Sequence, residues 1–195
     1  MTNPYPDQIL QCIADMPADG LALEVGSGGR FIEPRVIGME ITSCPTADLL
    51  GDVLDLPFGG EVFDFVFSQA VLEHVKDPQR AVDEMVRVLK PGGVFYCEVA
   101  FMQPVHMAPI HFFNHTPYGV AHICSALQQI HLSPIGRFDE TFRWWAEESG
   151  AGLILGSIAL DEIVEKLEPV HDNSSWDQKL NGASGIAYLG TKRVG

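Results

Sequence analysis

Residues 21–29, Leu21-Ala-Leu-Glu-Val-Gly-Ser-Gly-Gly29, join a short apolar run to a turn rich in glycine. The apolar run predicts a buried β-strand. The glycines let a ligand approach the backbone closely, because no Cβ atom intrudes. In open α/β sheets, ligands bind at the carboxyl ends of the strands. This stretch therefore predicts a ligand site at the turn, with a plain tight turn as the alternative.

The details of this turn disfavour the common nucleotide-binding motifs. Phe31 stands where a dinucleotide-binding fingerprint would have its third glycine, and the sequence has no Gly-Lys-Ser/Thr phosphate-binding segment. Glu24, just before the turn, would repel a pyrophosphate and would suit a cationic ligand.

Strand and helix patterns alternate on both sides of the turn. Strands are expected at 21–25, 35–39, 47–50, 62–67 and 94–99. Helices are expected at 7–16 and from an Asp77 cap to the Pro91-Gly92-Gly93 stop. Such alternation favours a parallel sheet. The expected fold class is α/β: a Rossmann-like, doubly wound, mostly parallel sheet with helices on both faces and a helical or irregular insertion before the last strand.

The pattern loosens after residue 100. We expect a loop at 101–115, a helix from Thr116-Pro117 to about Ile130, mostly helix at 139–171 and a polar loop at 172–181. A final strand at 183–190 would complete the sheet, antiparallel and at or near an edge. The chain is expected to be one domain, 1–195. A cofactor-binding core would span 20–100, an acceptor-side loop and helical insertion 101–181, and the final strand 183–191.

Composition narrows the choice of ligands. The chain has 195 residues and a net charge of −14, and the pair Lys192-Arg193 is the nearest approach to a basic run. This charge disfavours nucleic acid and anionic membranes, and favours a small or neutral substrate. No apolar window is long enough for a membrane span, and residues 1–7 do not resemble a signal peptide. Four cysteines without a C-x-x-C pair fit a reduced, cytoplasmic protein.

Two acidic residues after later strands have chemistry that suits a nucleoside. Glu40 ends the second predicted strand, where a carboxylate can accept both hydroxyls of a ribose. Asp52 lies in the segment 51–58 and can accept a hydrogen bond from an adenine amine. The alternatives are a solvated surface acid for Glu40 and a capped turn for Asp52.

Four short segments add a family resemblance. They are Leu56-Pro57-Phe58, Phe63-Asp64, Leu72-Glu73-His74-Val75 and Arg87-Val88-Leu89-Lys90-Pro91-Gly92-Gly93. In this order and spacing, together with the glycine turn, Glu40 and Asp52, the sequence resembles the class I S-adenosylmethionine-dependent methyltransferases. The resemblance is of the small-molecule type in a shortened variant, and it covers about residues 20 to 100.

The resemblance implies a set of cofactor-binding residues. Glu24 and the turn Gly26, Ser27 and Gly28 would hold the methionine end; Glu40 would take the ribose hydroxyls, with Ile41 packed on the adenine; Asp52 and Val53 would bind the adenine edge; and Ser68 and Gln69 would lie beside the sulfonium.

Two departures from the family pattern concern the shape of this site. Arg30 stands where many members have a third glycine. Only 12 residues separate Glu40 from Asp52, which leaves no room for the helix that most members insert there. We therefore expect the adenine side of the site to be open. Members with this shortened spacing include domains associated with sugar or cell-surface polymer assembly.

Histidines are concentrated after the fifth predicted strand, where a methyl acceptor would lie. They are His106, His111, His115, His122 and His131. His106 or His111 can be a general base, and His74, next to the fourth strand, is a third catalytic candidate. The alternatives are plain hydrogen-bonded loop histidines, or a structural role for His74. Metal binding is a further alternative, but no histidine pair has the helical i, i+4 zinc spacing with a Glu between, so no metal ligands are predicted. Trp144 and Trp145 are candidates for an acceptor pocket or for the core.

The sequence thus predicts transfer of a methyl group from S-adenosylmethionine to a small-molecule or glycan-like acceptor, leaving S-adenosylhomocysteine. One alternative is a methyltransferase-like module that acts as a non-catalytic binding partner. Another is a nicotinamide-dependent dehydrogenase, which the missing glycine at Phe31 disfavours.

Overall fold

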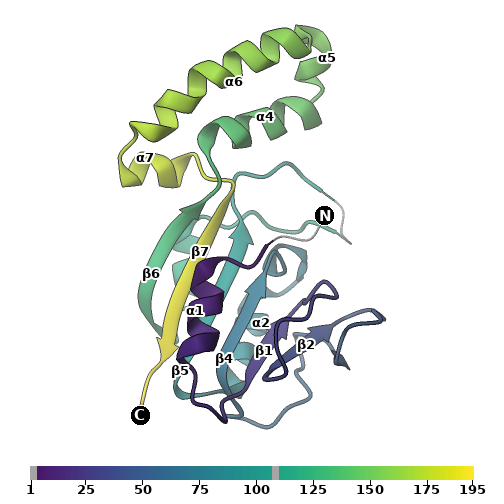
Figure 1. The fold of residues 1–195 in the computed structure, drawn as a ribbon, viewed down its shortest axis with the longest axis vertical. Helices are drawn as coiled ribbons and strands as arrows, with labels where there is room; N and C mark the ends of the chain where they lie inside the picture. The colour runs from purple at the N-terminus through teal and green to yellow at the C-terminus, as the bar shows by residue number, and fades with distance from the viewer. Residues whose placement is uncertain (1–3, 107–109) are drawn as a thin grey trace.

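The computed structural model describes residues 4–106 and 110–195, so residues 107–109 of the predicted loop 101–115 lie outside the described part. Its centre is a seven-stranded sheet of order β3-β2-β1-β4-β5-β7-β6 (Figure 1). The strands are β1 (Ala22–Val25), β2 (Val36–Glu40), β3 (Leu49–Leu50), β4 (Phe63–Gln69), β5 (Leu89–Ala100), β6 (Leu127–Ile135) and β7 (Gly185–Lys192). The first five pair in parallel, and β7 runs antiparallel between β5 and β6. The predicted fold class is confirmed.

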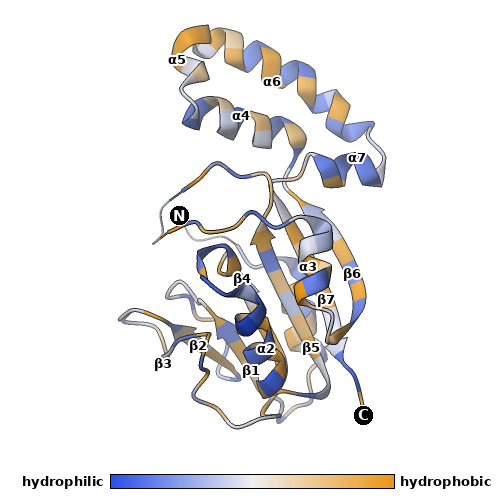
Figure 2. Cartoon of the chain, turned by 180° about the vertical axis from the view of Figure 1, so that it is seen from behind, coloured by the Kyte–Doolittle hydropathy of each residue, from blue (hydrophilic) through white to orange (hydrophobic). Residues whose placement is uncertain are grey.

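Helices cover both faces of the sheet. Alternate residues of β4 point to opposite sides, and both sides carry buried apolar residues, so each face needs a covering helix. Phe65 and Phe67 share a buried cluster with Ile9 and Ile13 of α1 (Asp7–Asp15). Val66 belongs instead to the cluster that holds the apolar stripe of α2 (Pro78–Val88). Figures 1 and 2 show these two helices on opposite faces. The Asp77 side chain accepts from the Arg80 N–H at 3.0 Å and caps α2, as the sequence predicted.

A helical cap stands over the carboxyl ends of the parallel strands (Figure 1). It consists of α4 (Phe138–Glu148), α5 (Ala151–Leu155), α6 (Ser157–Asp172) and α7 (Trp176–Asn181). Its small core contains Ala146, Leu160 and Val164. Figure 2 shows that apolar residues also lie at its tip, on α5, where Leu153 and Ile154 are exposed. The cap places helical residues beside the end of the sheet where ligands bind.

Three expected boundaries were wrong. The helix expected to reach Ile130 is α3 (Pro117–Ile123), and 127–135 form β6, because pairing with β7 outweighs the local pattern. The polar segment 172–181 contains α7, which a Ser175–Gln178 capping box starts. α2 ends before Pro91, because Leu89 already pairs with Phe63 of β4.

Two further features affect the site. Residues 41–48, between β2 and β3, contain no helix, as the short spacing predicted. Among the described residues, no helix is long and apolar enough to cross a membrane.

Candidate functional site

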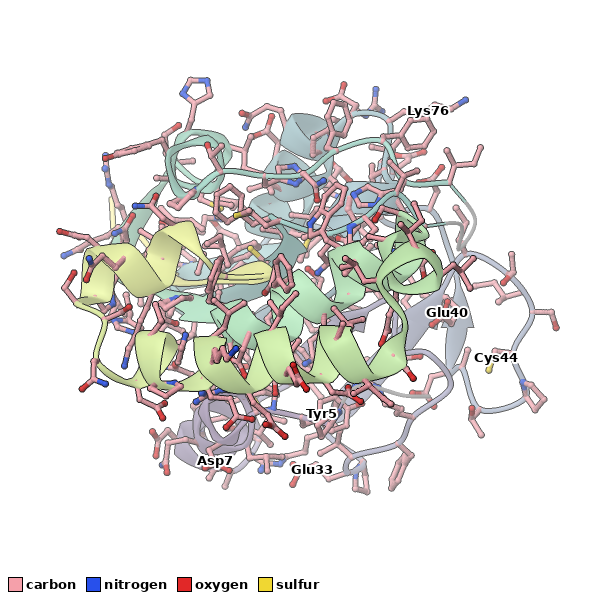
Figure 3. The ribbon with its side chains drawn as sticks, turned by 90° about the horizontal axis from the view of Figure 1, so that it is seen from above. Tyr5, Asp7, Glu33, Glu40, Cys44 and Lys76 are labelled. Atoms are coloured by element: carbon pink, nitrogen blue, oxygen red, sulfur yellow. The ribbon has the colours of Figure 1, made fainter. Side chains whose placement is uncertain are left out.

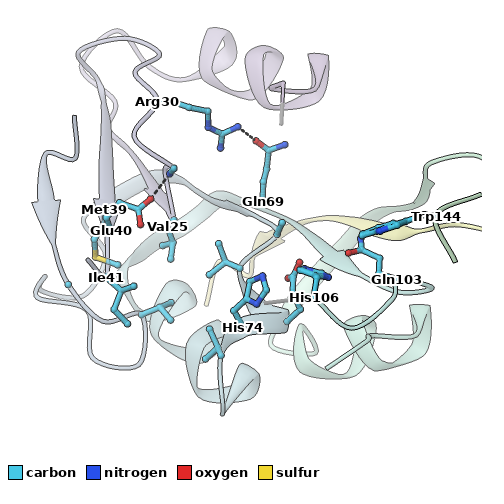
Figure 4. Close-up of a pocket in the computed structure, with 18 residues that line it drawn as sticks. Val25, Arg30, Met39, Glu40, Ile41, Gln69, His74, Gln103, His106 and Trp144 are labelled. Carbon is cyan, nitrogen blue, oxygen red and sulfur yellow. Dashed lines mark hydrogen bonds between the residues drawn. The ribbon is translucent and has the colours of Figure 1, made fainter. Parts of the chain in front are cut away.

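A pocket of about 700 Å³ opens at the carboxyl ends of β1, β2 and β4 (Figure 4). Its lining comes from the glycine turn, the β2–β3 connection, η1 (Leu72–His74), the segment after β5 and α4. The predicted site residues on its wall are Gly26, Gly28, Glu40, Ile41, Val53, Gln69, His74 and His106. Glu24, Ser27, Asp52, Ser68 and His111 are not part of the wall.

At one end of the pocket, the glycine turn is tied to Glu40. Gly26 and Gly28 have φ of +74° and +60°, a region that glycine adopts without strain. The Gly28 N–H donates to Oε1 of Glu40, and the Ser27 hydroxyl donates to the same oxygen at 3.4 Å. Oε2 of Glu40 has no hydrogen-bond partner in the described part of the chain. Ile41, beside it, is 66% exposed. This end therefore offers a carboxylate oxygen and an open apolar surface.

Figure 3 shows how open this end is. In the view onto the cap, Glu40 lies to one side of the cap helices. The β2–β3 connection that carries Ile41 has no helix to cover it. The uncovered β2–β3 connection is consistent with the open adenine side that the sequence predicts.

Glu24 lies behind the pocket wall and is 1% exposed. Its carboxylate accepts from Nη2 of Arg30 at 2.6 Å and from the Tyr5 hydroxyl at 2.8 and 3.0 Å. Burial raises the pKa of Glu24 to about 7, and the hydrogen bond from Tyr5 and the charge of Arg30 act in the opposite direction. Arg30 also stacks over the Tyr5 ring, 4.0 Å from its centroid, and donates to Gln69 at 3.0 Å. The cation on the wall is thus Arg30, which the sequence marked only as a departure.

The remaining cofactor candidates are divided between the wall and the fold. Val53 lines the pocket, whereas Asp52 accepts from the Leu54 N–H at 2.9 Å in its own turn. Gln69 lines the pocket and donates to Glu98 at 2.9 Å. Ser68 is buried, and its hydroxyl has no hydrogen-bond partner among the described residues.

The opposite end of the pocket carries His74 and His106, with Gln103 and Trp144 (Figure 4). Glu73 also lines this end; it is 0% exposed, and its two carboxylate oxygens have no partner within hydrogen-bond geometry in the described part of the chain. Burial raises the pKa of Glu73 to about 7 and lowers the pKa of His74. Both shifts have the same cause, because burial disfavours the charged form of each group.

The five histidines of 106–131 do not form one site. His111 contacts His106, with 3.1 Å between their Nδ1 atoms. His115 is buried, and its pKa falls to about 4, chiefly because of that burial. His122 and His131 are exposed on α3 and β6, and neither lines the pocket.

The sequence interpretation missed Tyr5 and Glu73 as site residues. Tyr5 lies near the start of the chain, and no local pattern connects it to the glycine turn. Glu73 stands inside the quoted segment Leu72-Glu73-His74-Val75, but nothing in the sequence shows that its carboxylate lacks a partner. Trp144 reaches the wall from the cap, whereas Trp145 donates to the Met102 carbonyl at 3.0 Å.

Comparisons with known proteins agree with this fold. A family model described as "Methyltransferase domain" matches residues 32–97. An uncharacterised methyltransferase of Schizosaccharomyces pombe is 45% identical over 51 residues, 26% of this chain and 18% of its own length. An uncharacterised protein of Methanocaldococcus jannaschii is 39% identical over 85 residues, 38% of this chain and 42% of its own.

The solved structures show the same architecture. The Haemonchus contortus phosphoethanolamine N-methyltransferase 2, in complex with phosphomonomethylethanolamine and S-adenosylhomocysteine, superposes with a TM-score of 0.58 at 16% identity. That match covers 96% of this chain and 53% of the other. Residues 32–97, about a third of the chain, match the methyltransferase-domain model, and the fold is that of this solved methyltransferase. The chain spans less than half the length of the two curated relatives described above.

The residues at the Glu40 end of the pocket are compatible with the cofactor that the resemblance implies. A Cβ atom placed on Gly28 would have no neighbour closer than 4.0 Å, so the turn leaves space for a ligand. One carboxylate oxygen of Glu40 makes no hydrogen bond within the described residues, and Met39, Ile41 and Val53 supply an apolar wall. The ion pair of Glu24 with Arg30 lies beside this pocket and does not fill it.

Proposed function

We propose that this chain transfers the methyl group of S-adenosylmethionine to a small-molecule or glycan-like acceptor inside the 700 Å³ pocket. The observation that carries the proposal is the pocket itself, which has a nucleoside-like end at Glu40 and a histidine-lined end at His74 and His106. The bound cofactor would supply a methyl group on a positively charged sulfur, which an acceptor oxygen or nitrogen can attack.

In this proposal the chain's residues at the first end bind and orient the cofactor. Oε2 of Glu40 accepts from the ribose hydroxyls, and Ile41 and Val53 contact the adenine. Arg30 is on the wall, so its guanidinium suits the carboxylate of the methionine end better than the buried Glu24 suits the amine. The roles assigned to Glu24, Asp52 and Ser68 by the resemblance remain predictions.

At the second end the residues position the acceptor and exclude water. Trp144 and Gln103 reach the wall from the cap and from the segment after β5. His74 and His106 present ring nitrogens that can accept a hydrogen bond from an acceptor hydroxyl or amine. Both nitrogens of His111 are engaged, with His106 and with the Phe113 carbonyl, so His111 acts through His106. Correct alignment of two reactants can by itself supply much of the rate.

A non-catalytic binding module is the second candidate. The ion pair of Arg30 with Glu24 and the uncovered side at Ile41 favour it, because both depart from the family's cofactor site.

Calorimetric titration with S-adenosylmethionine and with S-adenosylhomocysteine tests the proposal. We expect both to bind at micromolar concentration. Glu40→Ala should weaken both by about 1–3 kcal/mol, roughly 5- to 150-fold. Asp52→Ala should have a smaller effect, because its side chain is engaged in its own turn.

Glu162→Ala is the matched control, since Glu162 is an exposed acid on α6 away from the pocket. Failure of the unmodified protein to bind either compound would overturn the proposal and favour the non-catalytic module. Equal losses in Glu40→Ala and Glu162→Ala would contradict the placement of the ribose.

A further inference from the structure

Three side chains that share ligand chemistry meet at the end of the pocket away from Glu40. Glu73 and His74 follow β4, and His106 comes from the segment after β5. One carboxylate oxygen and one ring nitrogen from each histidine lie within 4.8 Å of one another. A tetrahedral zinc ion has ligand bonds of about 2.0–2.2 Å, so small side-chain rotations would bring these donors around one ion.

A hydrogen bond shows that Nδ1 of His74 is the ring nitrogen that carries the proton. Its Nδ1 lies 2.9 Å from the carbonyl oxygen of Ile110. A carbonyl oxygen only accepts, so Nδ1 is the donor and carries the proton. Nε2 of the neutral ring therefore has a bare lone pair. This is the arrangement of a metal-binding histidine whose other nitrogen donates to the backbone.

The same argument applies to His106 through its neighbour. Nε2 of His111 donates to the Phe113 carbonyl at 2.9 Å, so Nδ1 of the neutral His111 ring is an acceptor. It lies 3.1 Å from Nδ1 of His106, which is also 3.1 Å from the Pro104 carbonyl. Nδ1 of His106 has two acceptors around it and therefore carries the proton. Its Nε2 is the bare nitrogen.

Glu73 supplies an independent observation. It is 0% exposed and lines the pocket. The backbone N–H groups of Glu73 and Ala100 act to lower its pKa, but neither of its oxygens has a partner within hydrogen-bond geometry, and no cation pairs with it, in the described part of the chain. A buried carboxylate without a partner is costly, and a bound cation removes that cost. The nearby guanidinium of Arg30 forms its ion pair with Glu24 instead.

We propose that Glu73, His74 and His106 bind one divalent transition-metal ion, with Zn²⁺ as the best match. Two imidazole nitrogens and one carboxylate are the ligand set of catalytic zinc sites, which keep a fourth position open. Here that position faces the pocket, where an oxygen or nitrogen of the acceptor can bind the ion, in place of the direct hydrogen bond to His74 or His106. This last role rests on the proposed function, whereas the metal site does not.

The sequence predicts no metal ligands because no histidine pair at i, i+4 spacing has a Glu between. Within the described residues, the fold instead joins Glu73 and His74 to a histidine that follows the next strand. No spacing rule along the chain identifies such a set.

Metal titration of the chelator-stripped protein, without cofactor, tests the proposal. We expect one Zn²⁺ per chain by calorimetry. Co²⁺ should give the visible absorption of a four-coordinate ion, and Zn²⁺ should displace it. His106→Ala and Glu73→Gln should each weaken Zn²⁺ binding by about 100-fold or more. His122→Ala is the matched control, because His122 is an exposed histidine on α3 that does not line the pocket.

Titration of His106→Ala with S-adenosylhomocysteine separates this proposal from the previous one. Retained cofactor binding with lost metal binding supports the metal site and shows that the variant is folded. Unchanged Zn²⁺ affinity in His106→Ala, an equal loss in His122→Ala, or no binding at micromolar Zn²⁺ would overturn the proposal. Since His106 is not part of the buried core, His106→Ala decides the matter even if Glu73→Gln fails to fold.

Discussion

Glu24 and Glu73 are both buried carboxylates near the carboxyl ends of adjacent strands, yet their surroundings are opposite. Glu24 is 1% exposed and accepts from Arg30 and Tyr5. Glu73 is 0% exposed and has no hydrogen-bond partner in the described part of the chain. Burial raises the pKa of each carboxyl to about 7. The difference therefore lies in what compensates the charge once it forms.

This difference separates a carboxylate whose charge the fold compensates from one whose charge it does not. The fold supplies a cation to Glu24, and the resulting contacts fix the glycine turn and the segment around Tyr5. At Glu73 the described residues form no ion pair, and His74 and His106 lie beside it. A buried acid that the fold leaves uncompensated indicates a site for a cation.

Removal of the Glu24 charge gives the largest effect expected. Glu24→Gln leaves the guanidinium of Arg30 largely buried without its anion, so the free energy of unfolding should fall by about 3 kcal/mol. Urea unfolding at about pH 9 measures this change, because Glu24, with its pKa raised to about 7, is ionised there. Glu33→Gln is the matched control, because Glu33 pairs with Arg35 at the same 2.6 Å, but the two side chains are 34% and 30% exposed. That variant should lose less than about 1 kcal/mol. Equal losses of stability in Glu24→Gln and Glu33→Gln would show that burial does not make the Glu24–Arg30 pair more important than an exposed pair.

The corresponding change at Glu73 should have the opposite sign. Glu73→Gln removes a charge that has no partner, so the chelator-stripped protein should gain about 1–2 kcal/mol of stability at about pH 8. Urea unfolding in chelator measures it beside Glu24→Gln. With Zn²⁺ in excess, Glu73→Gln should be less stable than the unmodified protein, because the variant loses the stabilisation that a bound ligand gives. Loss of stability in chelator would mean that Glu73 makes a stabilising contact within the fold.

The sequence predicted the parallel half of the molecule well, because its signals are local. The run Leu21–Val25, the Asp77 cap and the glycine turn each determine their own structure. The final strand was also recognised, since Ile186 and Tyr188 belong to an apolar run. The mostly helical content of 139–171 was also predicted.

The failures share one physical cause, which is dependence on distant segments. The sequence of β6 shows little apolar alternation. It forms a strand because its backbone pairs with that of β7. The engagement of Glu24 could not be predicted, since it needs Arg30 to fold back across the turn and Tyr5 to reach it from the chain's beginning. The grouping of His74 with His106 likewise depends on the segment after β5 crossing over η1.

A third carboxylate extends the comparison to the surface, with the smallest expected effect. Asp64 accepts from Lys90 at 2.8 Å and from the Leu21 N–H at 3.0 Å. Burial by itself would raise the pKa of Asp64, but these hydrogen bonds outweigh it and bring the pKa below its ordinary value of 3.8. An acid with a lowered pKa stabilises the fold above its unfolded pKa and loses that contribution as pH falls. Asp64→Asn should therefore cost about 0.5–1 kcal/mol at neutral pH, and the cost should vanish as pH falls through the lowered pKa. Thermal unfolding across this range, beside the exposed control Asp19→Asn, measures the change. A cost that persists at the acid end would mean that packing, rather than charge, distinguishes Asp64 from Glu24.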